Sequence, residues 1–259
     1  MKQKQEIAVI TGGGSGIGKA AAIRLAKEGK TVCIMDLKEE RAEKVKEEIE
    51  DNGGQAQVYD VDVKDEKRIQ DSFKAIEQEF DGQIDTVFIN AGINGTWTAI
   101  EDMKVDDWDA TLETNLRSTF LFVKHSIPYM KEKGGSIIIT SSINGNRMFS
   151  NIGMSAYSTS KAGQVAFMKM AALELARYKI RVNAICPGAI KTNIGENTHP
   201  EPELEKVKIP VEYPEGSQPL EHKPGSPDQV ADLVYFLASD LSSHITGTEI
   251  FIDGAESLL

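Results

Sequence analysis

The stretch "SAYSTSK" (155–161) opens a run whose pattern predicts a helix. It places the Tyr157 phenol and the Lys161 ammonium four residues apart, a spacing that brings two side chains together on one face of a helix. A free phenol, with a pKa of about 10, is a poor general base at neutral pH, and a cation held beside it lowers that pKa. The pair is therefore a candidate for proton transfer. The alternative is a surface helix whose first turn carries an aromatic ring and a solvated cation.

A glycine-rich turn, "TGGGSGIG", stands between an apolar run and a helix-like segment. Its spacing is G-x-x-x-G-x-G, and such a turn lets bare backbone approach a pyrophosphate, which free helix N–H groups can bind. The alternative is a loop that only makes a tight turn. Because the strand before, the helix after and an acid downstream agree, we favour a dinucleotide site. It would use Gly12, Ser15, Gly16, Ile17 and Gly18.

The downstream acid is Asp36, which closes the second apolar run. This is the position expected to accept hydrogen bonds from the adenosine ribose hydroxyls. A carboxylate there repels a 2′-phosphate, and neither Ser15 nor Leu37 offers a cation to hold one. The residues thus favour NAD over NADP as the cofactor. The alternative is that Asp36 only caps the following helix.

Small and polar residues follow three further apolar runs: Asn-Ala-Gly at 90–92, Ser-Ser at 141–142 and Pro-Gly at 187–188. In open α/β sheets, ligands bind at the edge where the carboxyl ends of the strands lie. The helix that carries Tyr157 and Lys161 begins at the same edge. We therefore expect one site that joins these segments.

The elements that must position these residues alternate along the whole chain. Strand-like runs lie at 7–11, 31–36, 56–63, 84–90, 136–142, 180–187 and 248–253, and helix-like segments lie near 16–29, 39–52, 65–80, 106–132, 156–178 and 227–238. This alternation predicts an α/β chain, a single-domain Rossmann fold over residues 1–259 with a doubly wound parallel sheet of about seven strands flanked by helices. Residues 193–227 are Pro-rich, acidic and without a clear period, so we expect a substrate loop or lid there.

The composition argues against several partners. The 259 residues include 29 basic and 40 acidic side chains, for a net charge of −11, whereas nucleic acids and anionic membranes need a basic face. We expect neither as a partner. Cys33 and Cys186 offer no disulfide framework, and the four histidines show no metal-ligand spacing, so no metal is expected. The opening "MKQKQEIAVI" lacks a signal-peptide apolar core, and we expect a cytoplasmic location.

Five motifs stand in order along the chain: "TGGGSGIG", "NAG", "ITSSING", "YSTSK" and "NAICPGAIKT". With this ordered set the chain resembles the short-chain dehydrogenase/reductase family over nearly its whole length. The resemblance implies hydride transfer between a nicotinamide cofactor and a carbonyl or secondary alcohol carbon. It implies that Tyr157 is the general acid/base and that Lys161 binds the nicotinamide ribose and lowers the tyrosine pKa. Ser142 would hydrogen-bond the substrate oxygen, with Ser141 as the competing choice, and Asn115 would hold a water in the proton relay.

The same resemblance implies further cofactor contacts beyond the glycine-rich turn and Asp36. These residues are Asp62, Val63, Asn90, Ala91, Gly92, Tyr157, Lys161, Pro187, Gly188, Ile190 and Thr192. Asp62 and Val63 would hold the adenine, and Thr192 would contact the carboxamide. The chain departs from the commonest family pattern at Ala255, where a second glycine is frequent, and in a slightly long loop between Ser142 and Tyr157.

Three functional hypotheses follow. The first is an NAD-dependent oxidoreductase that acts on a small or medium alcohol/ketone pair. The second is a 3-oxoacyl-thioester (acyl-carrier-protein) reductase, an activity that normally draws on NADPH. The third is a non-catalytic NAD-binding sensor or scaffold, which would have no need of Ser142, Tyr157, Lys161 and Asn115 together. We expect a homo-oligomer, with a tetramer favoured, although the apolar helix "QVAFMKMAALELA" could equally face the sheet.

Overall fold

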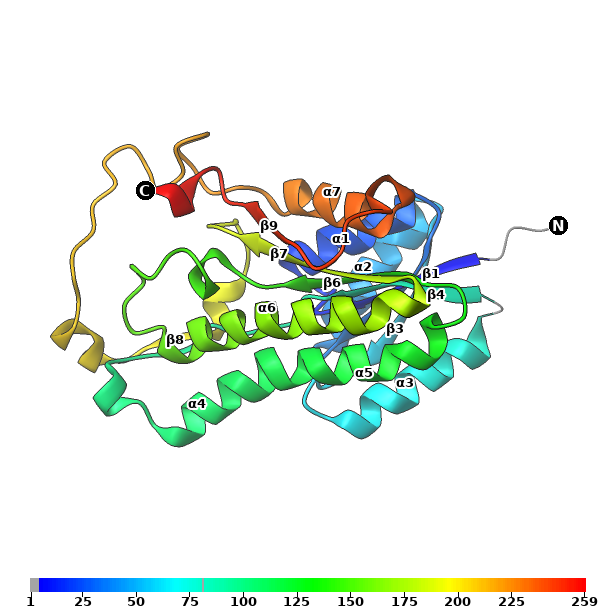
Figure 1. Cartoon of the computed structure of the whole chain (residues 1–259), viewed down its shortest axis with the longest axis horizontal. Coiled ribbons are helices and arrows are strands. Elements are labelled where there is room, and N and C mark those ends of the chain that lie inside the picture. The colour runs from blue at the N-terminus through cyan, green and yellow to red at the C-terminus, as the bar shows by residue number, and fades with distance from the viewer. Residues whose placement is uncertain (1–4, 81) are drawn as a thin grey trace.

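The computed structural model describes residues 5–80 and 82–259. Seven parallel strands form one sheet in the order β3-β2-β1-β4-β6-β7-β9 (Figure 1). The strands are β1 (Gln5–Thr11), β2 (Thr31–Asp36), β3 (Gln55–Asp60), β4 (Gly82–Ile89), β6 (Gly135–Thr140), β7 (Ile180–Pro187) and β9 (Glu249–Ile252). The strand order reverses between β1 and β4, so a topological switch point lies there. The predicted doubly wound sheet is confirmed.

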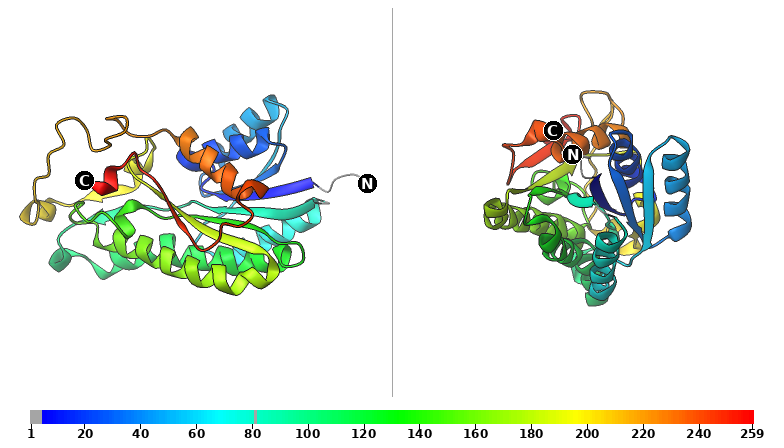
Figure 2. Two further views of the ribbon diagram at one scale, coloured as in Figure 1. Left: turned by 45° about the horizontal axis from the view of Figure 1, so that its top comes forward. Right: turned by 90° about the vertical axis from the view of Figure 1, so that its right-hand side faces the viewer.

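Helices cover both faces of this sheet (Figures 1 and 2). One layer contains α1 (Gly16–Lys27), α2 (Glu39–Asp51) and α7 (Pro227–Ala238), and the other contains α3 (Glu66–Glu79), α5 (Ser118–Met130) and α6 (Ser155–Leu175). Strand β1 shows why both layers form. Ile7 and Val9 pack into the core under α3, α5 and α6, whereas Ala8 and Ile10 pack into the core under α1, α2 and α7. Side chains that alternate between two apolar faces need cover on both sides.

The single helix expected over 106–132 is divided in the structure. Helix α4 (Val105–Leu112) passes through a π-helical turn (Glu113–Arg117) into α5. An apolar periodicity tolerates one extra residue, so the sequence pattern did not reveal this turn. Such π-turns are frequent at functional sites, and this one contains the buried Asn115.

Residues 193–227 are irregular, as predicted, but a small second sheet was missed. Strand β8 (Thr198–Pro200) pairs in parallel with β5 (Gly95–Trp97), and short 3-10 turns at Ile194–Asn197 and Pro202–Lys206 flank it. Two three-residue strands carry too little pattern to be recognised from sequence. Their pairing fastens the first part of the segment beside the loop that follows β4.

The start of α7 shows how the segment ends. Ser226 accepts a hydrogen bond from the Gln229 main-chain N–H, and the Gln229 side chain accepts one from the Ser226 N–H. This reciprocal capping, with Pro227 at the first helical position, fixes the residue at which the irregular segment ends and α7 begins.

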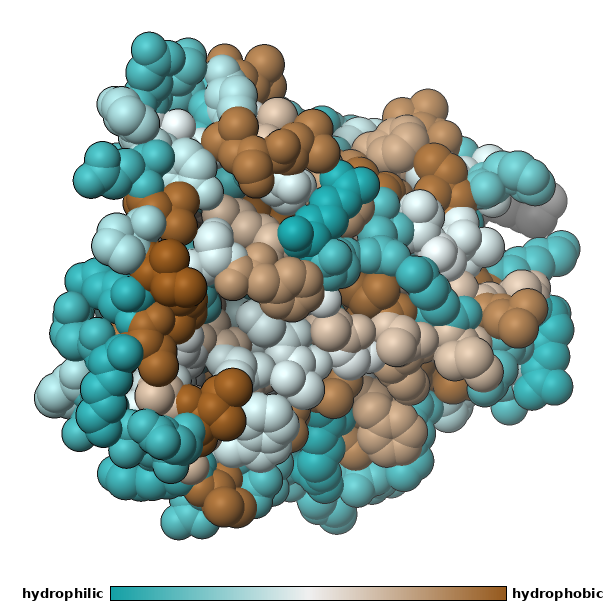
Figure 3. Space-filling view, turned by 60° about the vertical axis from the view of Figure 1, so that its left-hand side comes forward, coloured by the Kyte–Doolittle hydropathy of each residue, from teal (hydrophilic) through white to brown (hydrophobic). Residues whose placement is uncertain are grey.

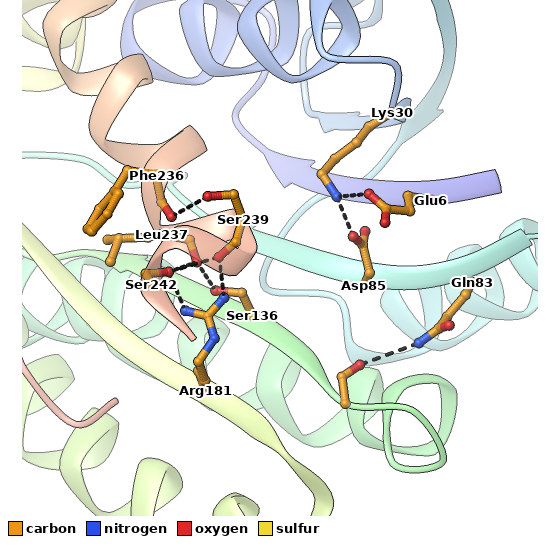
Figure 4. A network of polar contacts seen from close by, with 11 residues as sticks. Glu6, Lys30, Gln83, Asp85, Ser136, Arg181, Phe236, Leu237, Ser239 and Ser242 are labelled. Carbon is orange, nitrogen blue, oxygen red and sulfur yellow. Dashed lines mark hydrogen bonds and ion pairs between the residues drawn. The ribbon is translucent and has the colours of Figure 1, made fainter. Parts of the chain in front are cut away.

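Polar contacts hold the edge of the sheet where the strands begin (Figure 4). Lys30 Nζ contacts Glu6 Oε2 at 2.7 Å and also pairs with Asp85. Burial raises the pKa of the Asp85 carboxyl to about 6, and the Lys30 charge opposes that rise. On β7, Arg181 donates to Ser242 Oγ at 2.7 Å. This edge is thus occupied by structural contacts, and the opposite edge is the one that carries a cavity.

Among the helices that the structure describes, none combines the length and apolar character needed to cross a membrane.

Candidate active site

A cavity of about 710 Å³ lies at the carboxyl ends of the parallel strands. Most of the residues predicted from the sequence line it: Gly12, Ser15, Gly16, Ile17, Asp36, Asp62, Val63, Asn90, Ala91, Gly92, Ser142, Tyr157, Lys161, Pro187, Gly188, Ile190 and Thr192. Two predicted residues, Gly18 and Asn115, are buried and do not line it. The structure therefore brings the predicted segments to one place.

The glycine-rich turn forms one wall of the cavity and leads into α1. Gly16 has φ +53°, a conformation that favours glycine, and a Cβ built on it would lie 3.3 Å from the Thr192 side chain, so the turn and the segment after β7 lie close together. Ser15 precedes the helix without a side-chain capping hydrogen bond, so its side chain leaves the first-turn N–H groups available to an anion. A Cβ on Gly18 would stand 2.1 Å from the Gly12 carbonyl oxygen, so Gly18 permits close packing of the turn.

Asp36 connects the turn to the start of α2. Its Oδ2 accepts a hydrogen bond from the Gly14 N–H at 2.8 Å, and its Oδ1 accepts one from the Lys38 N–H at 2.9 Å. Asp36 thus bonds the N–H of Lys38, the residue before α2, and caps none of the N–H groups of that helix. A carboxylate offers about four acceptor positions, so these two bonds leave room for ribose hydroxyls. Asp36 also lines the cavity, which a purely local cap would not require.

Two cations at this end of the cavity were missed from the sequence. Lys38 and Arg41 both line it beside Asp36. A Cβ built on Gly14 would lie 2.9 Å from Asp36 Oδ2 and 3.1 Å from Arg41 Cβ, so the guanidinium side chain starts next to the carboxylate. The sequence reasoning considered only Ser15 and Leu37 as sources of positive charge. The signal was present in "DLKEER", where one helical turn places Arg41 above Lys38.

Thr11 and Asn90 form hydrogen bonds between the strand ends at the switch point. Thr11 Oγ1 accepts hydrogen bonds from the main-chain N–H groups of Asn90 (2.9 Å) and Ala91 (3.0 Å). Thr140 Oγ1 in turn donates to Asn90 Oδ1 at 3.2 Å. These bonds tie together the ends of β1, β4 and β6, and sequence reasoning did not identify Thr11 as part of the site.

Tyr157 and Lys161 occupy the first two turns of α6 and are buried, with exposed fractions of 7% and 3%. The alternative of a solvated surface turn is therefore wrong. Lys161 Nζ lies 5.6 Å from the centre of the Tyr157 ring and donates a hydrogen bond to the Thr140 carbonyl oxygen at 2.8 Å. A buried ammonium held beside a phenol at a cavity wall is suited to proton transfer.

The direction of the Tyr157 shift differs from the sequence-based expectation. In the protein alone, burial raises the pKa of the Tyr157 phenol, and the hydrogen bond with Ser142 opposes that rise. Burial also lowers the pKa of Lys161 to about 8. Desolvation disfavours both charged forms, and it could not be read from residue spacing. The phenol is therefore protonated at neutral pH, in the form that can donate a proton.

Ser142 and Ser141 have different surroundings, which bears on the choice between them. Ser142 Oγ accepts a hydrogen bond from the Asn144 N–H at 3.2 Å and pairs with Tyr157. Ser141 Oγ donates to the Lys161 carbonyl oxygen at 2.9 Å, which engages its proton in holding α6. The contact with the phenol favours Ser142 as the group that meets a substrate oxygen.

Asn115 lies behind the cavity wall, in the π-helical turn. Its Oδ1 accepts from the Ile93 N–H, and its Nδ2 donates to the Ile93 carbonyl and to Ser160 Oγ, all within 3.0 Å. A Cβ built on Gly92 would stand 3.0 Å from Asn115 Oδ1 and 3.5 Å from Lys161 Nζ, so both groups approach the backbone that follows β4. The Asn115 main-chain oxygen accepts hydrogen bonds from Gln164 Nε2 and from the Thr119 hydroxyl. The water-holding role of Asn115 stays a prediction.

The residues present fit a dinucleotide cofactor. A glycine cradle and the start of α1 offer N–H groups to a pyrophosphate, Asp36 offers acceptors at one end, and Lys161 offers a donor at the other. Within residues 5–80 and 82–259, no group of three or more His, Cys, Asp or Glu side chains is arranged to hold a metal ion. Both cysteines are buried free thiols.

Comparisons with known proteins agree with this geometry. Residues 12–255 match a family described as enoyl-(acyl carrier protein) reductase. The 3-oxoacyl-[acyl-carrier-protein] reductase of Thermotoga maritima is 37% identical over 255 residues, 98% of each chain. Levodione reductase of Leifsonia aquatica is 35% identical over 97% of this chain and 94% of its own. A crystal structure of a 3-ketoacyl-ACP reductase from Sinorhizobium meliloti superposes with a TM-score of 0.91, at 43% identity over 97% of this chain and 99% of that one.

Fold, cavity and relatives lead to one conclusion. The chain belongs to the short-chain dehydrogenase/reductase family, as an oxidoreductase that uses a nicotinamide cofactor on CH–OH or keto groups.

Proposed function

We propose that this chain is an NAD-dependent dehydrogenase/reductase for a small or medium alcohol/ketone pair. The observation that carries the proposal is one cavity with Asp36 at one end and Ser142, Tyr157 and Lys161 at the other. When bound, the nicotinamide ring supplies or accepts the hydride. The chain then has to hold the substrate oxygen and to move one proton.

In the proposed mechanism, Ser142 Oγ donates a hydrogen bond to the substrate oxygen while the Asn144 N–H fixes the position of that hydroxyl. During reduction Tyr157 Oη gives its proton to the oxygen, and during oxidation it takes the proton back. The protonated phenol of the protein alone is ready for the first of these directions. Lys161 binds the nicotinamide ribose and stabilises the phenolate that forms.

The part of the cavity near Ser142 supports a substrate with oxygen atoms close to the reacting carbon. Asn144 and Asn151 line it, and Asn151 Nδ2 donates to Asn144 Oδ1 at 3.0 Å. Among the described residues, Asn144 Nδ2 and Asn151 Oδ1 have no hydrogen-bond partner, so one donor group and one acceptor are left for a substrate. Amide groups of this kind recognise hydroxyl and carbonyl groups better than an acyl chain.

A 3-oxoacyl-thioester reductase is the second candidate, because a relative and a structural neighbour carry that name. The experiment that separates the two is a screen by nicotinamide absorbance. Small alcohols and ketones, and a 3-oxoacyl thioester, are each offered with NAD(H) and NADP(H). We expect turnover of a small substrate with NAD(H). A kcat/KM at least tenfold higher for the thioester would favour the second candidate, and no turnover of any carbonyl or alcohol would reject both.

We also propose a homo-oligomer, with a tetramer favoured. Helix α6 buries Met168 and Leu175 against the sheet and exposes Met170 and Leu173, and this exposed apolar face supports the proposal. Light scattering at micromolar concentration should show a mass of about four chains, and a monomer would contradict the proposal. The cytoplasmic location stays a prediction.

A further inference from the structure

Four charged side chains meet at the adenosine end of the cavity. Asp36, Lys38 and Arg41 come from the end of β2 and the start of α2, and Glu196 comes from the short turn after Thr192. Glu196 Oε2 accepts a hydrogen bond from Arg41 Nη2 at 2.9 Å and lies 3.8 Å from Lys38 Nζ. A segment 155 residues further along the chain thus contacts the helix that begins beside the ribose position.

Glu196 is held in this arrangement from its other side as well. Asn193 Nδ2 donates to Glu196 Oε1 at 3.1 Å, so both carboxylate oxygens have partners. The hydrogen bond from Arg41 lowers the pKa of Glu196, followed by the bond from Asn193, and the side chain is ionised at neutral pH. Exposed ion pairs of this kind add little to folding stability. The main effect of the Arg41–Glu196 ion pair is therefore expected on the binding of charged ligands at this end of the cavity.

The charge balance bears on the choice between the two nicotinamide dinucleotides. The two cations and two carboxylates of this cluster sum to zero, and so do Asp62 and Lys64, which also line the cavity. Without Glu196, the same residues would carry a net positive charge, and the Arg41 guanidinium would be free. A free guanidinium binds phosphate through two parallel N–H bonds, which is the recognition that a 2′-phosphate requires.

We propose that Glu196 is a second determinant of cofactor specificity, which disfavours NADP(H) because it occupies Arg41 and Lys38, two cations that would otherwise bind a 2′-phosphate. The inference rests on the proposed binding of the dinucleotide with its adenosine ribose beside Asp36. It does not rest on the identity of the substrate or on catalysis. Glu196 thereby acts from the segment 193–227, whereas Asp36, the carboxylate identified from sequence, acts from the end of β2.

The test is a binding measurement on the full-length protein at low ionic strength. Dissociation constants for NADH and NADPH are measured by the change in nicotinamide fluorescence for the native chain and for Glu196→Gln. The matched control is Glu205→Gln, which removes the same charge from the same segment. Glu205 pairs with Lys208 and does not line the cavity. A third protein, Arg41→Ala, is measured with and without Glu196→Gln.

We expect Glu196→Gln to lower the ratio of the NADPH to the NADH dissociation constant about fivefold to tenfold, a range set by one released charge-assisted contact to phosphate. Added salt should shrink this change, because exposed charges are screened. In the Arg41→Ala background, Glu196→Gln should lower the ratio by about threefold or less, because only the repulsion between the Glu196 carboxylate and the 2′-phosphate is then removed. Glu205→Gln should leave the ratio within about twofold.

An unchanged ratio in Glu196→Gln would overturn the inference, as would an equal change in Glu205→Gln or an undiminished change in the Arg41→Ala background. These outcomes are separate from the proposed function. A native protein that prefers NADPH would contradict the proposed NAD dependence, yet a lower ratio in Glu196→Gln would still support the role of Glu196. If the native protein turns over a small substrate with NAD(H) but Glu196→Gln leaves the ratio unchanged, the proposed function stands and the role of Glu196 is rejected.

Discussion

Lys161 Nζ donates a hydrogen bond to the main-chain oxygen of Thr140, 2.8 Å away, at the point where β6 ends. The same ammonium lies 5.6 Å from the centre of the Tyr157 ring. One buried cation therefore joins α6 to the end of β6 and lines the cavity. Its charge state should control cofactor binding as well as proton transfer.

The first prediction concerns pH. Burial lowers the pKa of Lys161 to about 8, so the free protein loses this charge as the pH rises through that value. Lys161 has to be protonated to bind the nicotinamide ribose as an ammonium, so above pH 8 NADH binding has to be accompanied by uptake of a proton. We expect the NADH dissociation constant to be flat below pH 7 and to rise by up to about tenfold per pH unit above pH 8. Fluorescence titration between pH 6.5 and 9.5 measures this dependence.

Lys161→Met is the comparison for that titration, because it keeps a long apolar side chain and removes the titrating group. It should bind NADH more weakly, with no change between pH 7 and 9.5. The same rise in both proteins would show that another group is responsible.

The second prediction concerns residues 194–226, which we expect to become ordered over bound cofactor and substrate. The segment is fastened by β8 and by the Lys206–Asp102 ion pair at 2.9 Å, whereas it exposes Ile194, Val207, Ile209 and Val211. Figure 3 shows brown apolar side chains between teal ones on the side of the molecule that is turned forward. An exposed apolar segment beside a cavity can bury that surface by closing.

Hydrogen exchange with and without NADH tests the lid. Amides within 194–226 should exchange more slowly when NADH is bound. Amides in the second half of α3, which does not line the cavity, serve as the internal control. Identical exchange of the segment in both states would argue against closure.

The third prediction concerns Ala255, the position where the family often has glycine. Ala255 has φ +70° and ψ 14°, in the left-handed region that is costly for a side chain with a Cβ. Ala255→Gly should remove that strain and, after the entropy cost of glycine, stabilise the fold by about 0.5–1 kcal/mol. The melting temperature should rise by about 1–3 °C.

Ala176→Gly is the matched control, because Ala176 is exposed and has helical angles of φ −54° and ψ −36°. It should lower stability by about 0.5–1 kcal/mol. Destabilisation of the same size at both positions would mean that backbone strain at Ala255 has no measurable cost.

The sequence predicted the parts of the fold that depend on regular patterns. The apolar runs and the residues at their ends were enough to place Asp36, Tyr157 and Lys161 around one cavity, because parallel strands bring their carboxyl ends to the same edge. Strands of three residues, such as Gly95–Trp97 and Thr198–Pro200, carry no such pattern. The π-helical turn at Asn115 was hidden for a different reason, because one extra residue hardly changes the apolar periodicity of a helix.

The site features that could not be predicted depend on burial and on contacts between distant segments. The direction of the Tyr157 pKa shift follows from burial of the phenol, whereas spacing showed only the neighbouring cation. The contact between Arg41 and Glu196 joins two segments whose proximity no local motif reports. Sequence reasoning thus identified candidate residues, and the structure was needed for their electrostatic environment.

The central claim is that Tyr157 transfers the proton, and Tyr157→Phe tests it most directly. The variant keeps the buried ring and removes only the hydroxyl, so NADH should still bind, and Tyr178→Phe, outside the cavity, is the matched control. We measure kcat on the best substrate of the absorbance screen, with NADH binding checked by fluorescence. The account predicts a loss of about 10²-fold or more for Tyr157→Phe and a change below about twofold for Tyr178→Phe. Turnover by Tyr157→Phe within tenfold of the native protein would contradict it.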